Sequence, residues 1–284
     1  MLTNIREKTY NVFSLKGVIT EVGFSLSVFK SIYLVLGITL ATSIATTFLF
    51  ALLFIIFPNA GDSLQITISF VIPYLIELFI IRYLIDRFNI NFFKWFENIP
   101  SIKEIISIVG FFISFPIIVT SFFNIFRNPV SVEKNISSLS ITGFLGESNV
   151  LIAILGIAVI PIIFEEIIYR GIILKGMLKH YDTYNAIAFS ALLFGLVHFN
   201  SIRMIYTFIL GLALGYLYYK KSSLIYTMIA HFTVNSFTHL MNRYTKMPGY
   251  VDFSYKHMPI WFLGIGIILF IISVYLFNQT LDYN

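Results

Sequence analysis

The stretch PIIFEEIIYRG, residues 161–171, places two adjacent carboxylates and an arginine at the end of a long apolar segment. On a helix, Glu166 and Arg170 are four residues apart, so their side chains face each other and can pair. Glu165 lies about 100° around the helix from Glu166 and escapes that pairing. The spacing therefore predicts one structural ion pair and one free carboxylate, which the Tyr169 hydroxyl could orient.

The chain around this stretch is too hydrophobic for an ordinary soluble domain. Of its 284 residues, 58% are hydrophobic and 12% are charged, whereas a soluble domain is about a quarter charged. The apolar runs are continuous and do not alternate with polar residues, which favours helices over a β-barrel. We therefore expect an all-α polytopic membrane protein, with residues 1–284 forming a single membrane domain.

The apolar runs predict a bundle of about eight transmembrane helices. The candidate spans are residues 31–57, 64–86, 104–126, 149–178, 184–199, 204–219, 224–241 and 259–278. With the N-terminus inside, about two thirds of the 19 Lys and Arg residues fall on the inner side. This bias predicts that both termini lie in the cytoplasm. We expect an integral protein of a bacterial cell membrane.

The charge and cysteine content limit the possible partners. Lys and Arg are scattered singly or in pairs, so the net charge of +5 indicates no nucleic-acid partner. The absence of cysteine excludes disulfides, zinc–thiolate sites and a cysteine nucleophile. The expected partners are the lipid bilayer and a membrane-associated peptide or protein.

Two more segments place polar groups where lipid is expected. FGLVH carries His198 one turn after Phe194, and HFTVNSFTH carries His231, Asn235 and His239 on one helix face. Counted from Lys175 and Lys221 at the inner edge, Glu165 and His231 both lie ten residues, about 15 Å, into the membrane. Ionisable groups at such depth are costly and indicate function.

A further carboxylate lies in the second predicted span. Glu77 follows Pro73 by four residues. We expect it to have a structural role, either pairing with Arg82 or lining a cavity.

One unpaired glutamate, two histidines and an amide on three helices suit the activation of a water molecule. The glutamate can act as general base, one histidine can hold the same water, and the other histidine and the amide can donate to an oxyanion. Two histidines and a glutamate can also hold a catalytic zinc ion, although the HExxH motif is absent. These residues alone leave both mechanisms open.

At these positions the sequence resembles the CAAX protease and bacteriocin-processing (CPBP, or Abi) family of intramembrane proteases, which includes CAAX prenyl endopeptidases. The family pattern EExxxR, FxxxH and HxxxN reads here as residues 165–170, 194–198 and 231–235. The resemblance implies a catalytic core at residues 149–241 within a bundle of eight helices that encloses a polar cavity.

The resemblance also implies roles for single residues. Glu165 and His198 would activate water, and His231 and Asn235 would form the oxyanion hole. The supporting residues would be Glu166, Arg170, Tyr169 and Phe194. We expect no cofactor, with zinc on Glu165, His198 and His231 as the alternative.

Two other functions are compatible with the same sequence. The protein could be a non-catalytic membrane partner, such as a bacteriocin self-immunity protein or a regulator of a sensor kinase. It could also be a transporter that uses the buried glutamate and histidine as a proton relay. The absence of an obvious inverted repeat weakens the transporter hypothesis.

Overall fold

The computed structural model describes residues 25–56, 62–126, 154, 158–198, 201–241 and 260–281. Every regular element in these residues is helical, which confirms the predicted all-α class. The elements are α1 (Val28–Ile56), α2 (Asp62–Arg87), η2 (Phe92–Phe96), α3 (Ile102–Phe126), α6 (Ile160–Glu166), η4 (Ile167–Leu174), α7 (Lys175–Met177), α8 (Thr183–Leu196), α9 (Ser201–Lys221), α10 (Leu224–Leu240) and α11 (Ile260–Leu281). Much of the predicted span 149–178 before residue 158 lies outside the described residues.

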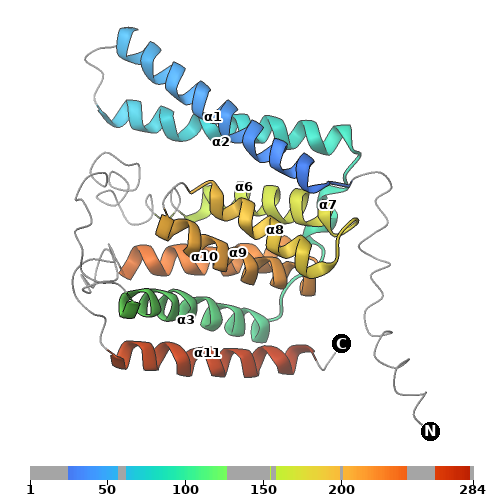
Figure 1. The fold of residues 1–284 in the computed structure, drawn as a ribbon, viewed down its shortest axis with the longest axis vertical. Helices are drawn as coiled ribbons and strands as arrows, with labels where there is room; N and C mark the ends of the chain where they lie inside the picture. The colour runs from blue at the N-terminus through green and yellow to red at the C-terminus, as the bar shows by residue number, and fades with distance from the viewer. Residues whose placement is uncertain are drawn as a thin grey trace.

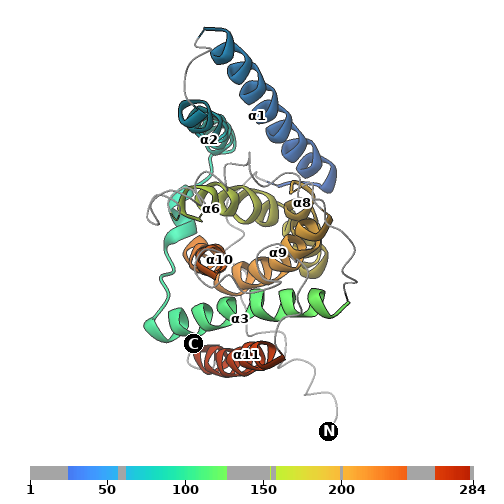
Figure 2. The same cartoon turned by 90° about the vertical axis from the view of Figure 1, so that its left-hand side faces the viewer.

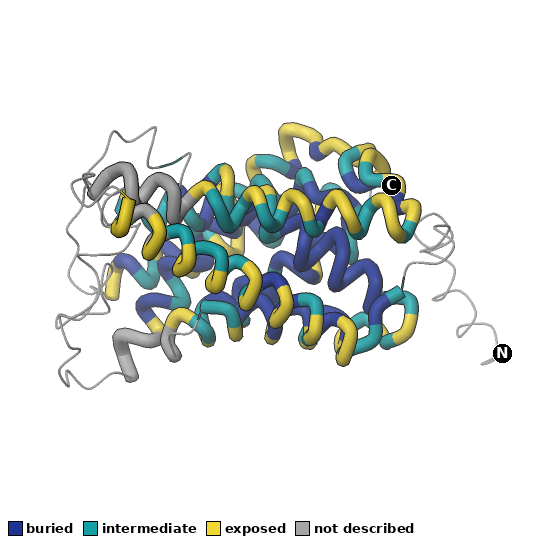
Figure 3. The backbone as a smooth tube through the Cα atoms, turned by 90° about the horizontal axis from the view of Figure 1, so that it is seen from above, coloured by how far each residue is buried: buried dark blue, intermediate teal, exposed yellow. Residues whose placement is uncertain are grey.

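The centre of the molecule is a ring of four helical rods. Elements α6, η4 and α7 follow one another directly and form one rod. This rod packs against α8, α8 against α9, α9 against α10, and α10 against α6 (Figure 2). Figure 3 shows buried residues concentrated in the central helices and exposed residues along the outer ones.

The remaining helices cover this ring from two sides. On one side α3 packs against α10, and α11 packs against α3 (Figure 1). On the other side α2 packs against α6, while α1 packs against α2 and α8. The segments that carry the three motifs therefore lie in the covered centre of the bundle.

Among the described residues, three helices are long and apolar enough to cross a membrane by themselves. They are α1, residues Ile102–Phe122 of α3 and residues Ile260–Thr280 of α11. The chain is thus an all-α membrane protein, but the predicted count of eight spans is too high by this measure. The outer helices carry the apolar surface that faces lipid.

Two of the other elements fall short for identifiable reasons. Helix α8 has 14 residues, or about 21 Å, against a hydrocarbon core of about 30 Å. The rod formed by α6, η4 and α7 contains Glu165, Glu166 and Arg170. Charged groups of this kind are tolerated because neighbouring helices cover them.

The helix ends assigned to the inner side lie together at one end of the bundle. The Leu26 amide donates to the Gly176 carbonyl at 3.0 Å, which joins the start of α1 to the end of α7. Lys221 Nζ pairs with Glu104 Oε1 at 2.7 Å, which joins the end of α9 to the start of α3. The start of α1 and the end of α11 are also at this end (Figure 1).

The short helix η2 fixes the motif-bearing rod from this same end. Trp95 is 1% exposed and packs so closely on Gly171 that a Cβ there would lie 2.7 Å from the indole ring. Segment η4 that follows the two glutamates is π-helical, a rare form that is frequent at functional sites. Pro161 lies in the first turn of α6, where a missing amide hydrogen costs little.

Candidate active site

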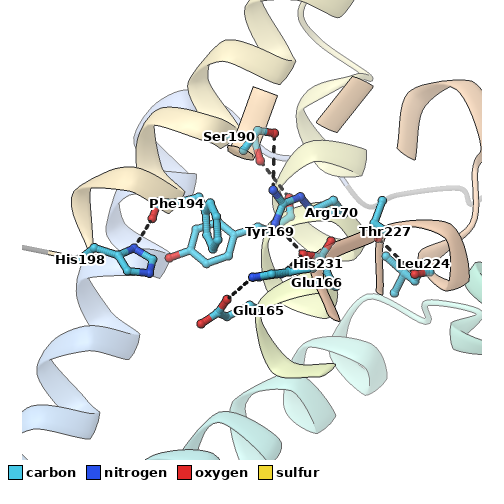
Figure 4. Close-up of polar contacts among 11 residues, drawn as sticks. Glu165, Glu166, Tyr169, Arg170, Ser190, Phe194, His198, Leu224, Thr227 and His231 are labelled. Carbon is cyan, nitrogen blue, oxygen red and sulfur yellow. Dashed lines mark hydrogen bonds and ion pairs between the residues drawn. The ribbon is translucent and has the colours of Figure 1, made fainter. Parts of the chain in front are cut away.

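Glu166 and Arg170 form the buried ion pair that their spacing predicts. Arg170 Nη1 donates to Glu166 Oε1 at 2.9 Å, and the two side chains are 1% and 0% exposed. The same oxygen accepts a second hydrogen bond from His231 Nδ1 at 2.8 Å (Figure 4). Glu166 therefore anchors the histidine of α10 to the rod that carries the two glutamates.

Arg170 extends this network to the other two rods of the ring. Its Nη2 donates to the Gly211 carbonyl of α9 at 3.4 Å, and its guanidinium lies 4.7 Å from the centre of the Phe194 ring on α8. Gly211 permits the close packing of α9 on α8, because a Cβ there would lie 2.9 Å from both Cα and Cβ of Ala191. Arg170 thus contacts α8 and α9 directly and is linked to α10 through Glu166 and His231.

Glu165 has a different environment from its neighbour. Its side chain is 31% exposed, and its Oε2 lies 3.6 Å from His231 Nε2. That separation allows electrostatic attraction but exceeds a hydrogen-bond distance. The structure thus confirms that Glu165 escapes the Arg170 pair and lies at the depth of His231.

His198 lies just beyond the last turn of α8. Its Nδ1 is 2.9 Å from the Phe194 carbonyl oxygen. Because a carbonyl oxygen only accepts, Nδ1 carries the proton, and in the neutral ring Nε2 keeps its lone pair. His198 can therefore accept a hydrogen bond at Nε2.

Phe194 is the apolar centre of the site. It is 1% exposed, and its ring centre lies 5.3 Å from that of His198 and 5.7 Å from that of His231. The Tyr169 ring packs edge-on against it at 5.0 Å. The FxxxH phenylalanine therefore fixes the relative positions of both histidines.

Two predicted contacts differ in the structure. The Tyr169 hydroxyl is directed toward His198 (Figure 4), and no hydrogen bond joins it to Glu165 in the described part of the chain. Arg82 pairs with Asp86 at 2.9 Å, so of the two alternatives for Glu77 the pair with Arg82 does not form in the described residues. Glu77 instead lies within electrostatic range of Glu165.

The structure leaves the predicted stripe on α10 only partly joined to the site. Asn235 is half-buried, one turn beyond His231. Neither Asn235 nor His239 has a described contact with the two glutamates. Of the four predicted catalytic residues, Glu165 contacts His231 directly, and His198 is linked to His231 through Phe194.

Sequence reasoning missed two contributors to the site. Gly211 supplies the carbonyl for Arg170, and its spacing of four from Gly215 is a signal of close helix contact. Tyr74 of α2 packs on Phe164, with ring centres 5.0 Å apart. No sequence signal identified Tyr74, because the contact depends on how α2 packs against α6.

The predicted zinc ligands do not converge. Among the described residues, no group of three His, Cys, Asp or Glu side chains has the spacing of a metal site. His231 Nδ1 donates to Glu166 and His198 Nδ1 to the Phe194 carbonyl, which leaves both Nε2 atoms as possible metal ligands. Glu165 Oε2 lies 3.6 Å from His231 Nε2, whereas Phe194 packs against both histidine rings, so the described contacts bring together two of the three predicted ligands.

Comparison with known proteins gives one match. Residues 147–237, about a third of the chain, match the family model described as type II CAAX prenyl endopeptidase Rce1-like. This segment contains all three motifs, so the match confirms the predicted resemblance and indicates an intramembrane protease of the CAAX type. No curated protein and no solved structure matches the chain.

Proposed function

We propose that the protein is an endopeptidase that hydrolyses a peptide bond in a membrane-associated peptide or protein tail, in a bacterial membrane with both termini cytoplasmic. The observation that carries this proposal is the contrast between two adjacent glutamates. Glu166 is fully buried and bound by two cations or donors, whereas Glu165 is accessible and lacks a close partner. Carboxylates in such different environments take different chemical roles.

The proposed reaction begins with water between Glu165 and His198. Glu165 takes a proton from the water, whose oxygen attacks the carbonyl carbon of the scissile peptide. His198 Nε2 accepts the second hydrogen of that water and orients it. When the tetrahedral intermediate collapses, the carbon–nitrogen bond breaks and the amine leaves with the proton held by Glu165.

The oxyanion is proposed to bind His231 and Asn235. With His231 Nδ1 donating to Glu166, His231 can donate to the oxyanion only from Nε2, which requires a proton on both ring nitrogens. Glu166 and Arg170 therefore act as positioning residues, since they fix the ring through which His231 would act. Asn235, one helical turn along the same face of α10, would add its amide.

The proposal does not include a metal ion. It is supported by the absence, among the described residues, of three His, Cys, Asp or Glu side chains placed to hold one metal ion. A chelator should leave peptide cleavage unchanged, and zinc should add nothing. Activity that is lost on chelation and restored by zinc would contradict this part of the proposal.

The test of the catalytic base is Glu165→Gln in the full-length protein reconstituted in liposomes. We expect loss of reporter-peptide cleavage with normal expression and insertion, and the same result for His198→Ala and His231→Ala. The matched control is Glu97→Gln, because Glu97 is exposed beyond η2 and should leave the rate unchanged. Cleavage by Glu165→Gln at the wild-type rate would show that Glu165 is not the base.

The same variants separate the protease from the alternative of a non-catalytic membrane partner. A cellular phenotype that disappears with Glu165→Gln supports hydrolysis as the biological role. A phenotype that survives substitution of all four proposed catalytic residues would favour an immunity or regulatory function.

A further inference from the structure

Tyr169 is held more firmly than a supporting residue requires. It is 6% exposed, and its ring packs edge-on against Phe194 of α8. Its backbone carbonyl accepts a hydrogen bond from Ser190 Oγ at 2.9 Å. Two independent contacts with α8 therefore fix where the hydroxyl at the end of the ring lies.

No described residue occupies the Tyr169 hydroxyl. It is directed toward His198, on the side of the cluster where Glu165 also lies (Figure 4). It is not one of the described polar atoms that are both inaccessible to solvent and without a hydrogen bond. It has no hydrogen bond in the described part of the chain. Because a buried tyrosine hydroxyl usually has a partner, an unused one at this position suggests that a ligand supplies the partner.

Besides His231 Nε2 and the Asn235 amide proposed above, the site has few donors for a developing negative charge. His231 Nδ1 donates to Glu166, and His198 Nδ1 donates to the Phe194 carbonyl. The carboxylate of Glu165, when ionised, only accepts. Among the side chains drawn around Phe194, the Tyr169 hydroxyl is a donor whose hydrogen is uncommitted (Figure 4).

We propose that Tyr169 is a further catalytic residue, whose hydroxyl donates a hydrogen bond to the scissile carbonyl oxygen as it becomes an oxyanion. This inference rests on the proposed peptidase function. When water attacks the carbonyl carbon, the electron pair of the carbon–oxygen double bond moves to the oxygen. Tyr169 stabilises that oxygen by a hydrogen bond and keeps its proton throughout, while Glu165 carries the proton taken from water.

Tyr169→Phe tests the proposal, because it removes the hydroxyl and keeps the ring that packs on Phe194. Loss of one oxyanion donor lowers kcat by roughly 100-fold or more, and we expect KM to stay within about two-fold because the contact forms in the transition state. The control is Tyr181→Phe, whose hydroxyl accepts from the Val28 amide at 3.2 Å, away from the site. Its kcat should equal that of the wild type.

A second measurement separates oxyanion binding from simple positioning. A peptidyl trifluoromethyl ketone, which forms a tetrahedral hydrate, should bind Tyr169→Phe more weakly by the same factor as kcat falls. The cleaved product peptide should bind as tightly as to the wild type. A wild-type kcat, or equal weakening of the ketone and the product, would overturn the role of Tyr169.

The outcomes for the two proposals differ. If the wild type cleaves peptide and Glu165→Gln does not, but Tyr169→Phe is fully active, only the role of Tyr169 fails. If the wild type cleaves no peptide in the liposome assay that contains its substrate class, both proposals fail.

Discussion

Glu165 and Glu166 are neighbours in the chain but differ in every contact that matters for chemistry. Glu166 is sealed from solvent and bound to Arg170 and His231. Even so, its Oε2 and the Arg170 Nε have no partner among the described residues. Buried polar atoms without partners cost stability, so we interpret this network as one kept to position His231.

The buried pair should be far more sensitive to substitution than an exposed pair of the same spacing. Glu166→Gln leaves the Arg170 charge buried without a counter-ion, which costs about 3–5 kcal/mol. Asp86→Asn breaks the Arg82–Asp86 pair, whose side chains are 72% and 54% exposed, and should cost at most about 1 kcal/mol. Reversible unfolding in mixed detergent micelles measures both. Equal losses would mean that Glu166 does not balance the Arg170 charge.

These single-residue contacts were predictable to different degrees. The Glu166–Arg170 pair follows from helical spacing within one segment, and the approach of His231 to Glu165 follows from depth counted along two helices. The direction of the Tyr169 hydroxyl did not follow. It depends on the packing of its ring against Phe194, which brings together two helices whose relative rotation no local pattern specifies.

The contact between helices α8 and α9 determines where Phe194 lies. Gly211 faces Ala191 across this contact, and a Cβ at position 211 would also lie 3.3 Å from Phe194 Cδ1. The same glycine presents its carbonyl to Arg170. Moving α9 away from α8 would therefore disturb the arginine and the phenylalanine together.

Gly211→Ala should reduce both stability and cleavage. Overpacking of this kind costs about 1–3 kcal/mol, and the displaced helices should lower kcat. The control is Gly264→Ala on α11, where an added Cβ would meet nothing within 4 Å and alanine favours the helix by up to about 1 kcal/mol. Unfolding and turnover measurements on both variants make the comparison. If the two variants behave alike, the close contact at Gly211 is not required.

The helices themselves were largely predictable, because long apolar runs bounded by polar residues specify them. The π-helical form of η4 was not, since hydrophobic periodicity does not distinguish a wider turn over eight residues. The burial of Trp95 against Gly171 was also not predictable. It requires η2 to fold back against a rod that lies some 70 positions later in the chain.

The polar residues of the candidate site lie inside the central ring of helices, which α1, α2, α3 and α11 cover from two sides. This arrangement explains why a count of eight spans from the sequence exceeds the three helices that qualify by length and apolarity. Hydropathy reports the apolar content of each segment, whereas the covering of a polar segment by its neighbours is a property of the assembled bundle. The inner ends are joined by Glu104, Lys221 and Asn98.

The orientation of this bundle in the membrane can be tested with single introduced cysteines. The chain has no cysteine, so each introduced cysteine is the only thiol. Tyr184 is 82% exposed at the end of the bundle where Lys and Arg concentrate, and the charge bias places this end in the cytoplasm. The same bias places Lys134, which lies outside the described residues, on the outer side.

A membrane-impermeant maleimide should therefore label Lys134→Cys in intact cells, and Tyr184→Cys only after permeabilisation. The unsubstituted protein should remain unlabelled throughout. Labelling in the opposite order would show that the bundle has the inverse orientation. The basic end, with the start of α1 and the end of α11, would then lie outside the cell.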